Sequence, residues 1–191
     1  VTARAPFGKQ NTLKGITLTI PPGNLVEITG NSGAGKTALA ETLLGVYPRA
    51  GGSYLCGGAN IDRFSSAQAR KIFGYAPQSE EFIQGTIADN ITGLGRPDDP
   101  EPLYAAARLA YVHEAIMALP DGYQTMLDST GTLLSRGQKS RISFARAIYH
   151  NPRILILDEP DIWLRSSLPR RLKPFVDGFL AKGNIFIVLS R

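Results

Sequence analysis

Short apolar runs, bounded by glycine and proline, alternate along this chain with segments in which apolar residues recur at helical spacing. Alternating or continuous apolar runs predict β-strands at residues 13–20, 25–29, 51–58, 73–78, 154–157 and 185–189. Helical spacing predicts helices at residues 38–44, 65–72 and 138–149, with a mostly helical stretch over residues 86–118. This order of elements is typical of an α/β protein with a parallel sheet. The first two strands are separated by a short turn that contains Pro21-Pro22-Gly23, which predicts an antiparallel pair.

Composition and charge narrow the class of protein. A chain of 191 residues with 43% hydrophobic content can bury one sizeable core. Its apolar runs are far shorter than the roughly 20 residues that span a bilayer. The lone cysteine, Cys56, excludes an intrachain disulfide and favours a reducing compartment. The net charge of +5 is spread along the chain without an aromatic-interleaved basic stripe, so the composition does not favour a nucleic-acid partner.

One octapeptide fits G-x-x-x-x-G-K-[ST], the pattern of a phosphate-binding loop. Its residues are Gly30, Asn31, Ser32, Gly33, Ala34, Gly35, Lys36 and Thr37. A predicted strand precedes it and a predicted helix follows it, and in that context backbone N–H groups and the helix N-terminus surround a phosphate. Lys36 would reach the outer phosphates and the Thr37 hydroxyl would hold Mg²⁺. We therefore expect the chain to bind a nucleoside triphosphate; the alternative is a glycine-rich turn with a solvated lysine.

Two carboxylates, Asp158 and Glu159, follow the all-apolar strand at residues 154–157. Ligands of parallel α/β sheets lie at the carboxyl ends of the strands. We therefore expect Asp158 to bind Mg²⁺ through water and Glu159 to act as a general base toward water that attacks the γ-phosphate. Gln78 ends another strand and could contact Mg²⁺ or the attacking water. The alternatives are that Asp158 or Glu159 caps the next helix and that Gln78 is an ordinary polar loop residue.

Taken in chain order, four segments resemble the nucleotide-binding domain of an ABC transporter: the phosphate loop, Gln78, residues 134–138 and the strand ending in Asp158-Glu159. The segment Leu134-Ser135-Arg136-Gly137-Gln138 is similar to the family's L-S-G-G-Q signature, with Arg136 in the first glycine position. The resemblance covers essentially the whole chain, and phrases such as Gly85-Thr86-Ile87-Ala88-Asp89-Asn90-Ile91 are most similar to bacterial exporters of peptides or proteins.

The resemblance also implies a partner. Two such domains stack head to tail in this family, with ATP between the phosphate loop of one domain and the signature of the other. Ser135, Gly137 and Gln138 would then contact the nucleotide bound to the second domain, at a helix N-terminus whose dipole favours phosphate. Gln78 would sense the γ-phosphate and couple it to the membrane-spanning part.

Four positions depart from the family's pattern. Arg136 puts a long cation where the backbone of a glycine usually approaches phosphate closely. Residues 162–165 read Ile-Trp-Leu-Arg, so the family's cross-dimer aspartate is missing. Ser190 falls on the family's switch histidine, and a hydroxyl cannot carry that residue's charge. The adenine-stacking aromatic falls on Ala5, with Phe7 the only ring nearby.

These observations predict a P-loop α/β core with a parallel sheet, a small antiparallel β lobe and a helical insert at about residues 79–138, together an ABC ATPase fold spanning residues 1–191. The expected function is ATP binding and hydrolysis that powers export through transmembrane domains, on the cytoplasmic side of the inner membrane. Because the chain begins without Met and stops after its last predicted strand, we expect a piece of a longer transporter. The alternatives are a degenerate domain that binds ATP with little hydrolysis and a soluble ABC ATPase acting on DNA or ribosomes.

Overall fold

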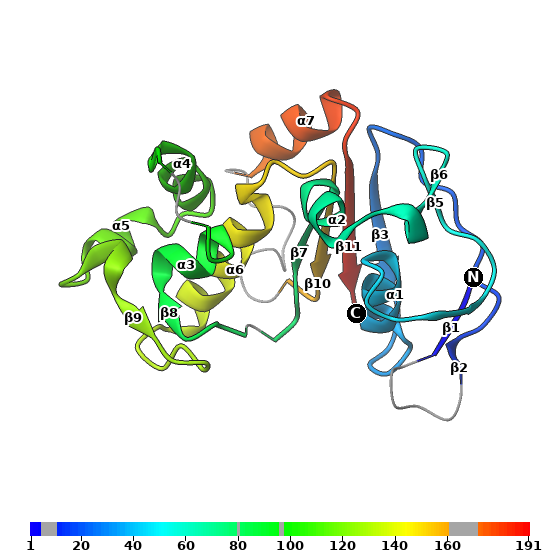
Figure 1. Ribbon diagram of the computed structural model, residues 1–191, viewed down its shortest axis with the longest axis horizontal. Helices are drawn as coiled ribbons and strands as arrows, with labels where there is room; N and C mark the ends of the chain where they lie inside the picture. The colour runs from blue at the N-terminus through cyan, green and yellow to red at the C-terminus, as the bar shows by residue number, and fades with distance from the viewer. Residues whose placement is uncertain (5–10, 80, 96–97, 161–171) are drawn as a thin grey trace.

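A parallel sheet occupies the centre of the computed structural model, which describes residues 1–4, 11–79, 81–95, 98–160 and 172–191 (Figure 1). Its four strands are hydrogen-bonded in the order β3-β11-β10-β7. Their bounds are β3 (Leu25–Thr29), β7 (Phe73–Ala76), β10 (Ile154–Asp158) and β11 (Ile185–Ser190). Because all four strands run in one direction, their carboxyl ends meet at the same edge of the sheet. The predicted α/β class is confirmed.

Helices cover both faces of this sheet (Figure 1). They are α1 (Lys36–Leu43), α2 (Ser66–Ile72), α6 (Arg136–Tyr149) and α7 (Lys173–Ala181). Successive side chains of a strand point to opposite faces, and β10 follows this rule. Leu155 and Leu157 belong to the core cluster that contains residues of α6 and α7. Ile156 belongs to a second cluster, which includes Ala40 of α1. The all-apolar composition of β10 therefore reflects burial on both faces.

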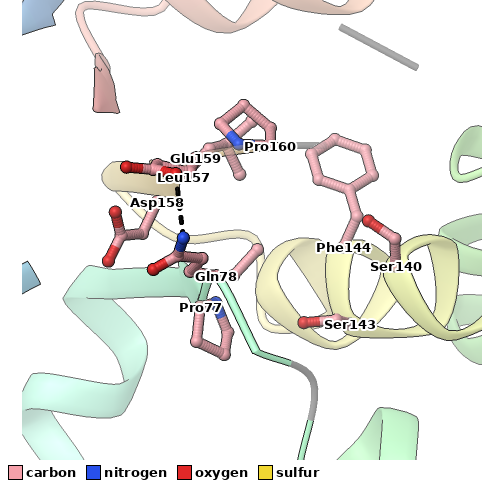
Figure 2. Close-up of a pocket in the computed structure, with 10 residues that line it drawn as sticks. Pro77, Gln78, Ser140, Ser143, Phe144, Leu157, Asp158, Glu159 and Pro160 are labelled. Atoms are coloured by element: carbon pink, nitrogen blue, oxygen red, sulfur yellow. Dashed lines mark hydrogen bonds between the residues drawn. The ribbon is translucent and has the colours of Figure 1, made fainter. Parts of the chain in front are cut away.

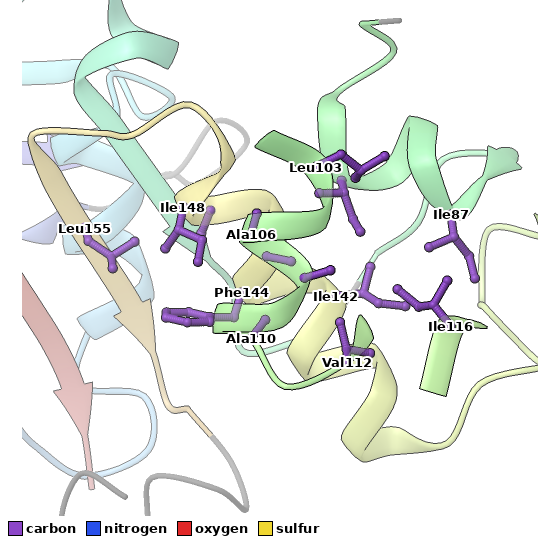
Figure 3. Close-up of a cluster of buried hydrophobic side chains, with 14 of the residues drawn as sticks. Ile87, Leu103, Ala106, Ala110, Val112, Ile116, Ile142, Phe144, Ile148 and Leu155 are labelled. Atoms are coloured by element: carbon purple, nitrogen blue, oxygen red, sulfur yellow. The ribbon is translucent and has the colours of Figure 1, made fainter. Parts of the chain in front are cut away.

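A helical part lies between β7 and α6 in the chain. Its elements are β8 (Gly85–Thr86), α3 (Ile87–Thr92), α4 (Glu101–Leu109), α5 (His113–Met117), the 3-10 turn η2 (Gly122–Gln124) and β9 (Met126–Leu127). The helical stretch predicted for residues 86–118 is thus confirmed. Figure 3 shows Ile87 and Ile116 from this part beside Ile142 of α6, with Leu155 of β10 at the other end of the same cluster. Helix α6 therefore connects the helical part to the sheet.

Arg146 fixes α6 to the segment that follows β7. Its Nε donates to the carbonyl of Asn90 at 2.7 Å and its Nη1 donates to the carbonyl of Glu81 at 3.0 Å. The guanidinium also lies over the ring of Phe82, 5.5 Å from the ring centroid. A planar cation that combines forked hydrogen bonds with a ring contact restricts both partners. The chain leaving Gln78 is thereby held on α6.

Small antiparallel elements form the lobe at the N-terminal end. Strands β1 (Thr2–Arg4), β2 (Asn11–Leu13) and β4 (Arg49–Gly51) pair in the order β2-β1-β4. A short hairpin, β5 (Leu55–Cys56) and β6 (Ala59–Asn60), is followed by the 3-10 turn η1 (Ile61–Arg63). The single strand predicted at residues 51–58 is therefore wrong in extent, because only its Leu55-Cys56 portion pairs in the hairpin.

The predicted strand at residues 13–20 is also wrong, as is its antiparallel pairing with residues 25–29. Strand β2 ends at Leu13, and Gly15 has φ +63°, which interrupts an extended chain. The partner of β3 is the parallel strand β11. The apolar alternation has another cause, because Ile16 packs in the cluster of the β lobe and Ile20 in the cluster beneath α1.

Candidate functional site

The segment between β3 and α1 forms a tight loop. Gly33 has φ +81° and Gly35, the N-cap of α1, has φ +93°, a backbone conformation that side chains disfavour. A Cβ added to Gly30 would lie 3.2 Å from the Cβ of Ala34, so the loop is closely packed on itself. The first N–H groups of α1 have no partner within the helix. Together these features build a concave backbone surface suited to an anion.

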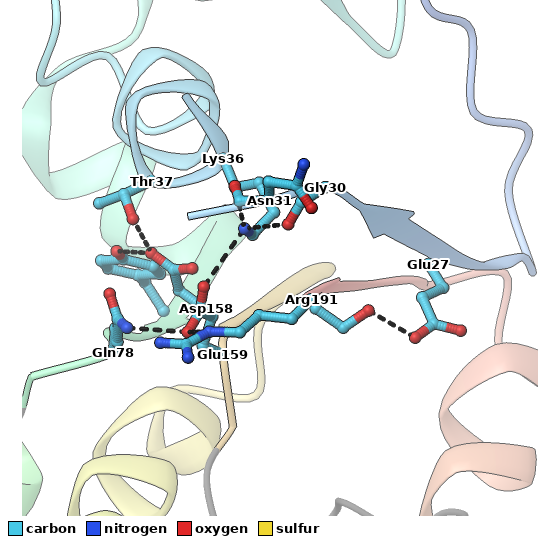
Figure 4. Close-up of polar contacts among 11 residues, drawn as sticks. Glu27, Gly30, Asn31, Lys36, Thr37, Gln78, Asp158, Glu159 and Arg191 are labelled. Atoms are coloured by element: carbon cyan, nitrogen blue, oxygen red, sulfur yellow. Dashed lines mark hydrogen bonds and ion pairs between the residues drawn. The ribbon is translucent and has the colours of Figure 1, made fainter. Parts of the chain in front are cut away.

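Lys36 lies inside this loop, and its residue is only 8% exposed. Its Nζ donates to the carbonyl of Gly30 at 2.7 Å and to that of Asn31 at 3.2 Å. The same Nζ forms an ion pair with Glu159 Oε1 at 3.2 Å (Figure 4). An ammonium has three protons, so each of them has a protein acceptor here. A phosphate that enters the loop must therefore displace one of these contacts.

Thr37 and Asp158 meet directly although they are far apart in the sequence. Thr37 Oγ1 donates to Asp158 Oδ2 at 2.6 Å, and the Tyr75 hydroxyl donates more weakly to the same oxygen at 3.4 Å. Burial, with the charge of Asp158 nearby, raises the pKa of Tyr75, so its hydroxyl stays a donor. Burial also raises the pKa of Asp158, against the hydrogen bonds from Thr37 and Tyr75.

The other oxygen of Asp158 bears on metal binding. Asp158 is 1% exposed, and within the described part of the chain its Oδ1 has no hydrogen-bond partner. A buried carboxylate oxygen without a donor is costly unless a cation or water satisfies it. Thr37 donates its proton to Oδ2, which leaves lone pairs on its hydroxyl for a cation. These residues therefore fit Mg²⁺, a hard ion that prefers oxygen ligands.

Among the described residues, three side chains donate to the carboxylate of Glu159, whose own side chain is 12% exposed. Its Oε2 accepts from Gln78 Nε2 at 2.8 Å and from Arg191 Nε at 2.9 Å, while Lys36 contacts Oε1. Burial works against ionisation, but the hydrogen bonds from Lys36 and Arg191 hold the pKa of Glu159 below its ordinary value. The carboxylate is therefore an anion, as a general base must be before it accepts a proton.

A pocket adjoins Gln78 and Glu159 at the edge of the sheet. Figure 2 shows its lining residues, which come from the ends of β7 and β10 and from α6. Ser143 of α6 lines the pocket, and its buried Oγ has no hydrogen-bond partner within the described residues. The pocket thus has a polar wall beside the carboxylate, a place where water can bind.

The signature-like residues lie elsewhere, at the start of α6. Ser135 is the N-cap of this helix, and its Oγ accepts from the N–H of Gln138 while Gln138 Oε1 accepts from the N–H of Ser135. A Cβ added to Gly137 would meet no atom of the described residues within 4 Å. Helix α6 and the helical part lie on one side of the sheet and α1 on the other (Figure 1). The structure therefore brings Lys36, Gln78 and Glu159 together but leaves the signature-like residues apart from them.

Ser190 is turned away from the phosphate loop. Its Oγ donates to Glu27 Oε1 of the neighbouring strand at 2.6 Å, and its backbone carbonyl accepts from the N–H of Gly30. The expectations for Ala5, Phe7 and residues 162–165 lie outside the described residues. Sequence reasoning missed the contacts of Tyr75 and Arg191. A tyrosine in a strand and an arginine after a strand carry no motif, so only the pairing of the strands reveals them.

The comparisons with known proteins agree with one another. The sequence profile described as ABC transporter matches residues 13–161. PrsD of Rhizobium meliloti (strain 1021), a type I secretion system ATP-binding protein, is 35% identical over 185 residues, which are 97% of this chain and 32% of PrsD. MchF of Escherichia coli, a probable microcin-H47 secretion/processing ATP-binding protein, is 37% identical over 175 residues, 92% of this chain and 24% of MchF.

The structural comparison gives the same result. A bacterial Atm1-family ABC exporter solved with ATP bound matches with a TM-score of 0.83 and 26% identity, covering 99% of this chain and 33% of that chain. The chain thus spans about a third or less of the length of these relatives. None of the helices formed by the described residues is long and apolar enough to cross a membrane.

Proposed function

Because this chain belongs to the ABC transporter family, as an ATPase domain homologous to those of exporters, we propose that it binds ATP with Mg²⁺ and hydrolyses it to power export. The observation that carries the proposal is the direct contact of Lys36 and Gln78 with Glu159, beside the bond between Thr37 and Asp158. These residues come from the carboxyl ends of different parallel strands and the loop between β3 and α1, where α/β proteins bind ligands.

Binding begins with an exchange of partners at Lys36. Phosphate oxygens entering the loop compete with the Glu159 carboxylate for Nζ, while the carbonyls of Gly30 and Asn31 keep the side chain in place. The backbone N–H groups at the start of α1 complete the anion site. The nucleotide therefore releases Glu159 from its ion pair at the moment when the substrate arrives.

Thr37, Asp158 and Gln78 are the residues that would hold the metal. When bound, Mg²⁺ neutralises charge on the phosphate oxygens. Asp158 Oδ1 is the buried acceptor that a cation, directly or through water, would satisfy. Thr37 anchors the other carboxylate oxygen and thereby fixes the direction of Oδ1.

Glu159 would then act as the general base. Its carboxylate accepts a proton from a water molecule whose oxygen attacks the γ-phosphorus, and the bond from that phosphorus to the β–γ bridging oxygen breaks. Gln78 donates to the same carboxylate, so it would also orient the water and sense the outer phosphate. These steps yield ADP and inorganic phosphate.

The proposed partners follow from what the site lacks. Ser135, Gly137 and Gln138 lie at the start of α6, apart from the chain's own phosphate loop, so they would contact ATP held by a second nucleotide-binding domain. Transmembrane domains would convert this pairing into transport, and the whole assembly would place the chain on the cytoplasmic side of the cell membrane. The relatives' names, which describe secretion ATP-binding proteins, support this proposal. The chain would then be one part of a longer transporter, with residues 79–138 as its helical subdomain.

A second candidate is a domain that binds ATP and pairs but hydrolyses slowly. The observation that favours it is the orientation of Ser190, which bonds to Glu27 instead of facing the phosphate loop. The intact arrangement of Gln78 and Glu159 favours hydrolysis.

Steady-state phosphate release with ATP and Mg²⁺ tests the proposal. We expect Lys36→Ala to abolish binding of a fluorescent ATP analogue, because the phosphates lose their buried cation. Glu159→Gln should retain binding and lose about 10²- to 10⁴-fold in turnover, the usual contribution of a general base. Lys71→Ala, an exposed lysine of α2, is the matched control. Binding without turnover in the unaltered protein would favour the second candidate, and unchanged binding by Lys36→Ala would refute both.

A further inference from the structure

The geometry points to Arg191 as a positioning residue for Glu159, a role that no motif assigns to it; the inference rests on the proposed hydrolysis. Arg191 Nε donates to Glu159 Oε2 at 2.9 Å, which makes a charge-assisted hydrogen bond and an ion pair in one contact. Ser190, the residue at the expected switch position, bonds to Glu27 instead. At this end of β11, the residue that contacts the proposed base is therefore Arg191, which follows Ser190 in the chain.

The strand geometry explains why Arg191 and not Ser190 faces the site. Ser190 ends β11, and its side chain lies on the same face as Val188, which is opposite Glu27 of β3. Successive side chains alternate between faces, so Arg191 extends to the other side. Its guanidinium then crosses toward β10, the other neighbour of β11 in the sheet.

The backbone of Glu159 is fixed to the same strand. Its N–H donates to the carbonyl of Leu189 at 2.8 Å, so β10 and β11 stay paired past the end of β10. Glu159 has φ +41°, a left-handed conformation that is uncommon for a residue other than glycine. Such a conformation persists only where surrounding contacts hold it, and it turns the carboxylate toward its donors.

Of the two cations that contact Glu159 among the described residues, Arg191 is the one that nucleotide binding leaves in place. Lys36 would be drawn to the phosphates, and Gln78 is a neutral amide with a proposed role toward the metal. Arg191 is a permanent cation, and its side chain, at 60% exposed, has room to follow the carboxylate. After Lys36 leaves, Arg191 thus keeps the Glu159 carboxylate in the orientation from which it takes a proton from water.

Turnover of ATP by the full-length protein tests this role. Arg191→Gln should lower kcat by about 10- to 100-fold, the range expected for a hydrogen bond between charged groups. KM and the affinity for a fluorescent ATP analogue should change by less than about twofold, because Arg191 lies on the base and not on the phosphate loop. Arg191→Lys should recover part of the loss, since it restores the charge without the planar fork.

Two controls separate this role from a general loss of structure. Arg70→Gln removes an exposed arginine of α2, and Ser190→Ala removes the hydroxyl that bonds to Glu27; both should keep kcat within about twofold. An unchanged or increased kcat in Arg191→Gln would overturn the inference, because Arg191 would then be inert or would sequester the carboxylate. An effect of Arg191→Gln confined to KM or nucleotide affinity would also overturn it.

A measurement without nucleotide distinguishes failure of this inference from failure of the proposed function. In a double-mutant cycle, Arg191→Gln is made in two backgrounds. When Glu159 is present it should lower Tm by about 1–3 °C, and when Glu159→Gln is already present it should leave Tm unchanged. If the protein released no phosphate at all, the proposed hydrolysis would fail, and this cycle would still test the contact. Equal shifts in both backgrounds would refute the pairing itself.

Discussion

At the scale of single residues, the two carboxylate oxygens of Asp158 have different surroundings, and this difference prepares one of them to bind a metal ion. Oδ2 accepts from Thr37 and Tyr75, whereas Oδ1 is buried with no donor among the described residues. The two hydroxyls fix the rotation of the carboxylate group, and this in turn fixes the direction in which Oδ1 points. A group that orients a metal ligand in this way, as Tyr75 does for Asp158, affects metal affinity without touching the metal.

We therefore expect Tyr75→Phe to lower the apparent affinity of the protein for Mg²⁺. The half-saturating Mg²⁺ concentration should rise by up to about 10-fold, the lower end for loss of such a partner, because the bond from Tyr75 is long at 3.4 Å. Titration of Mg²⁺ against phosphate release and against binding of a fluorescent ATP analogue measures it. Tyr54→Phe, which alters a tyrosine beneath Arg49, is the control. Equal Mg²⁺ dependence in both variants would show that Tyr75 has no part in orienting Asp158.

The proximity of the motif residues was predictable because each lies at the end of a parallel strand or in the loop and helix start that follow one. Lys36, Thr37 and Asp158 lie together for that reason, and so does Glu159. The contact of Arg191 with Glu159 was not predictable, since it requires the strand order β3-β11-β10-β7 and the phase of alternation at the end of β11. The orientation of Ser190 toward Glu27 depends on the same register.

At the scale of secondary structure, the contact between β7 and α6 positions Gln78. Gly74 of β7 lies so close to this helix that an added Cβ would be 2.1 Å from the carbonyl oxygen of Ala147 and 2.8 Å from Cγ of Pro152. The strand can approach the helix only because this residue has no side chain. This close packing sets the position of β7 against α6, and thereby the position of Gln78, which lies four residues after Gly74.

Gly74→Ala should therefore destabilise the protein. We expect a loss of about 1–3 kcal/mol or more in the free energy of unfolding, since the backbone of α6 cannot yield as a flexible side chain would. Gly178→Ala is the matched control, because Gly178 lies exposed within α7, where an added Cβ meets open space. That substitution should stabilise the protein by about 0.5–1 kcal/mol. Urea unfolding of both variants measures the difference, and two similar free energies would contradict the packing described.

The strand buried on both faces was predicted correctly, and so was the presence of a small antiparallel lobe, but the bounds of the strands in that lobe were not. The run at residues 154–157 predicts a strand covered on both sides, and β10 has that environment. Residues 13–20 alternate just as a strand would, yet Ile16 and Ile20 pack in different clusters. Hydrophobic alternation reports burial on one side and does not report hydrogen bonding. The two segments differ in whether their backbones pair with another strand, and the periodicity of the sequence carries no information on that pairing.

At the scale of the whole molecule, the two halves of the proposed ATP site lie in different parts of one chain. The phosphate loop opens at the carboxyl edge of the sheet, and the start of α6 belongs to the helical part (Figure 1). Ser135 and Arg136 are exposed there, and a Cβ added to Gly137 would meet none of the described atoms within 4 Å. Ser135 and Gln138 also cap α6, so these two residues have a structural reason to be present without a partner. Gly137 has no side chain with which to cap the helix, and its bare backbone would allow another molecule to approach closely.

This arrangement predicts a dimer that depends on nucleotide and on the charge of Arg136. Glu159→Gln should trap an ATP-bound pair, because substrate remains between the two domains when the base is absent. Adding Arg136→Glu should abolish that pair, since a carboxylate would then face the partner's phosphates, where like charges repel. Adding Arg70→Glu instead should leave the pair intact, because this exposed residue of α2 makes the same change in net charge elsewhere. Gel filtration with light scattering, in ATP and Mg²⁺, gives the molecular mass of each variant. If Arg136→Glu and Arg70→Glu both preserve the dimer, the start of α6 does not face the nucleotide of a second domain, and the proposed head-to-tail pairing is wrong.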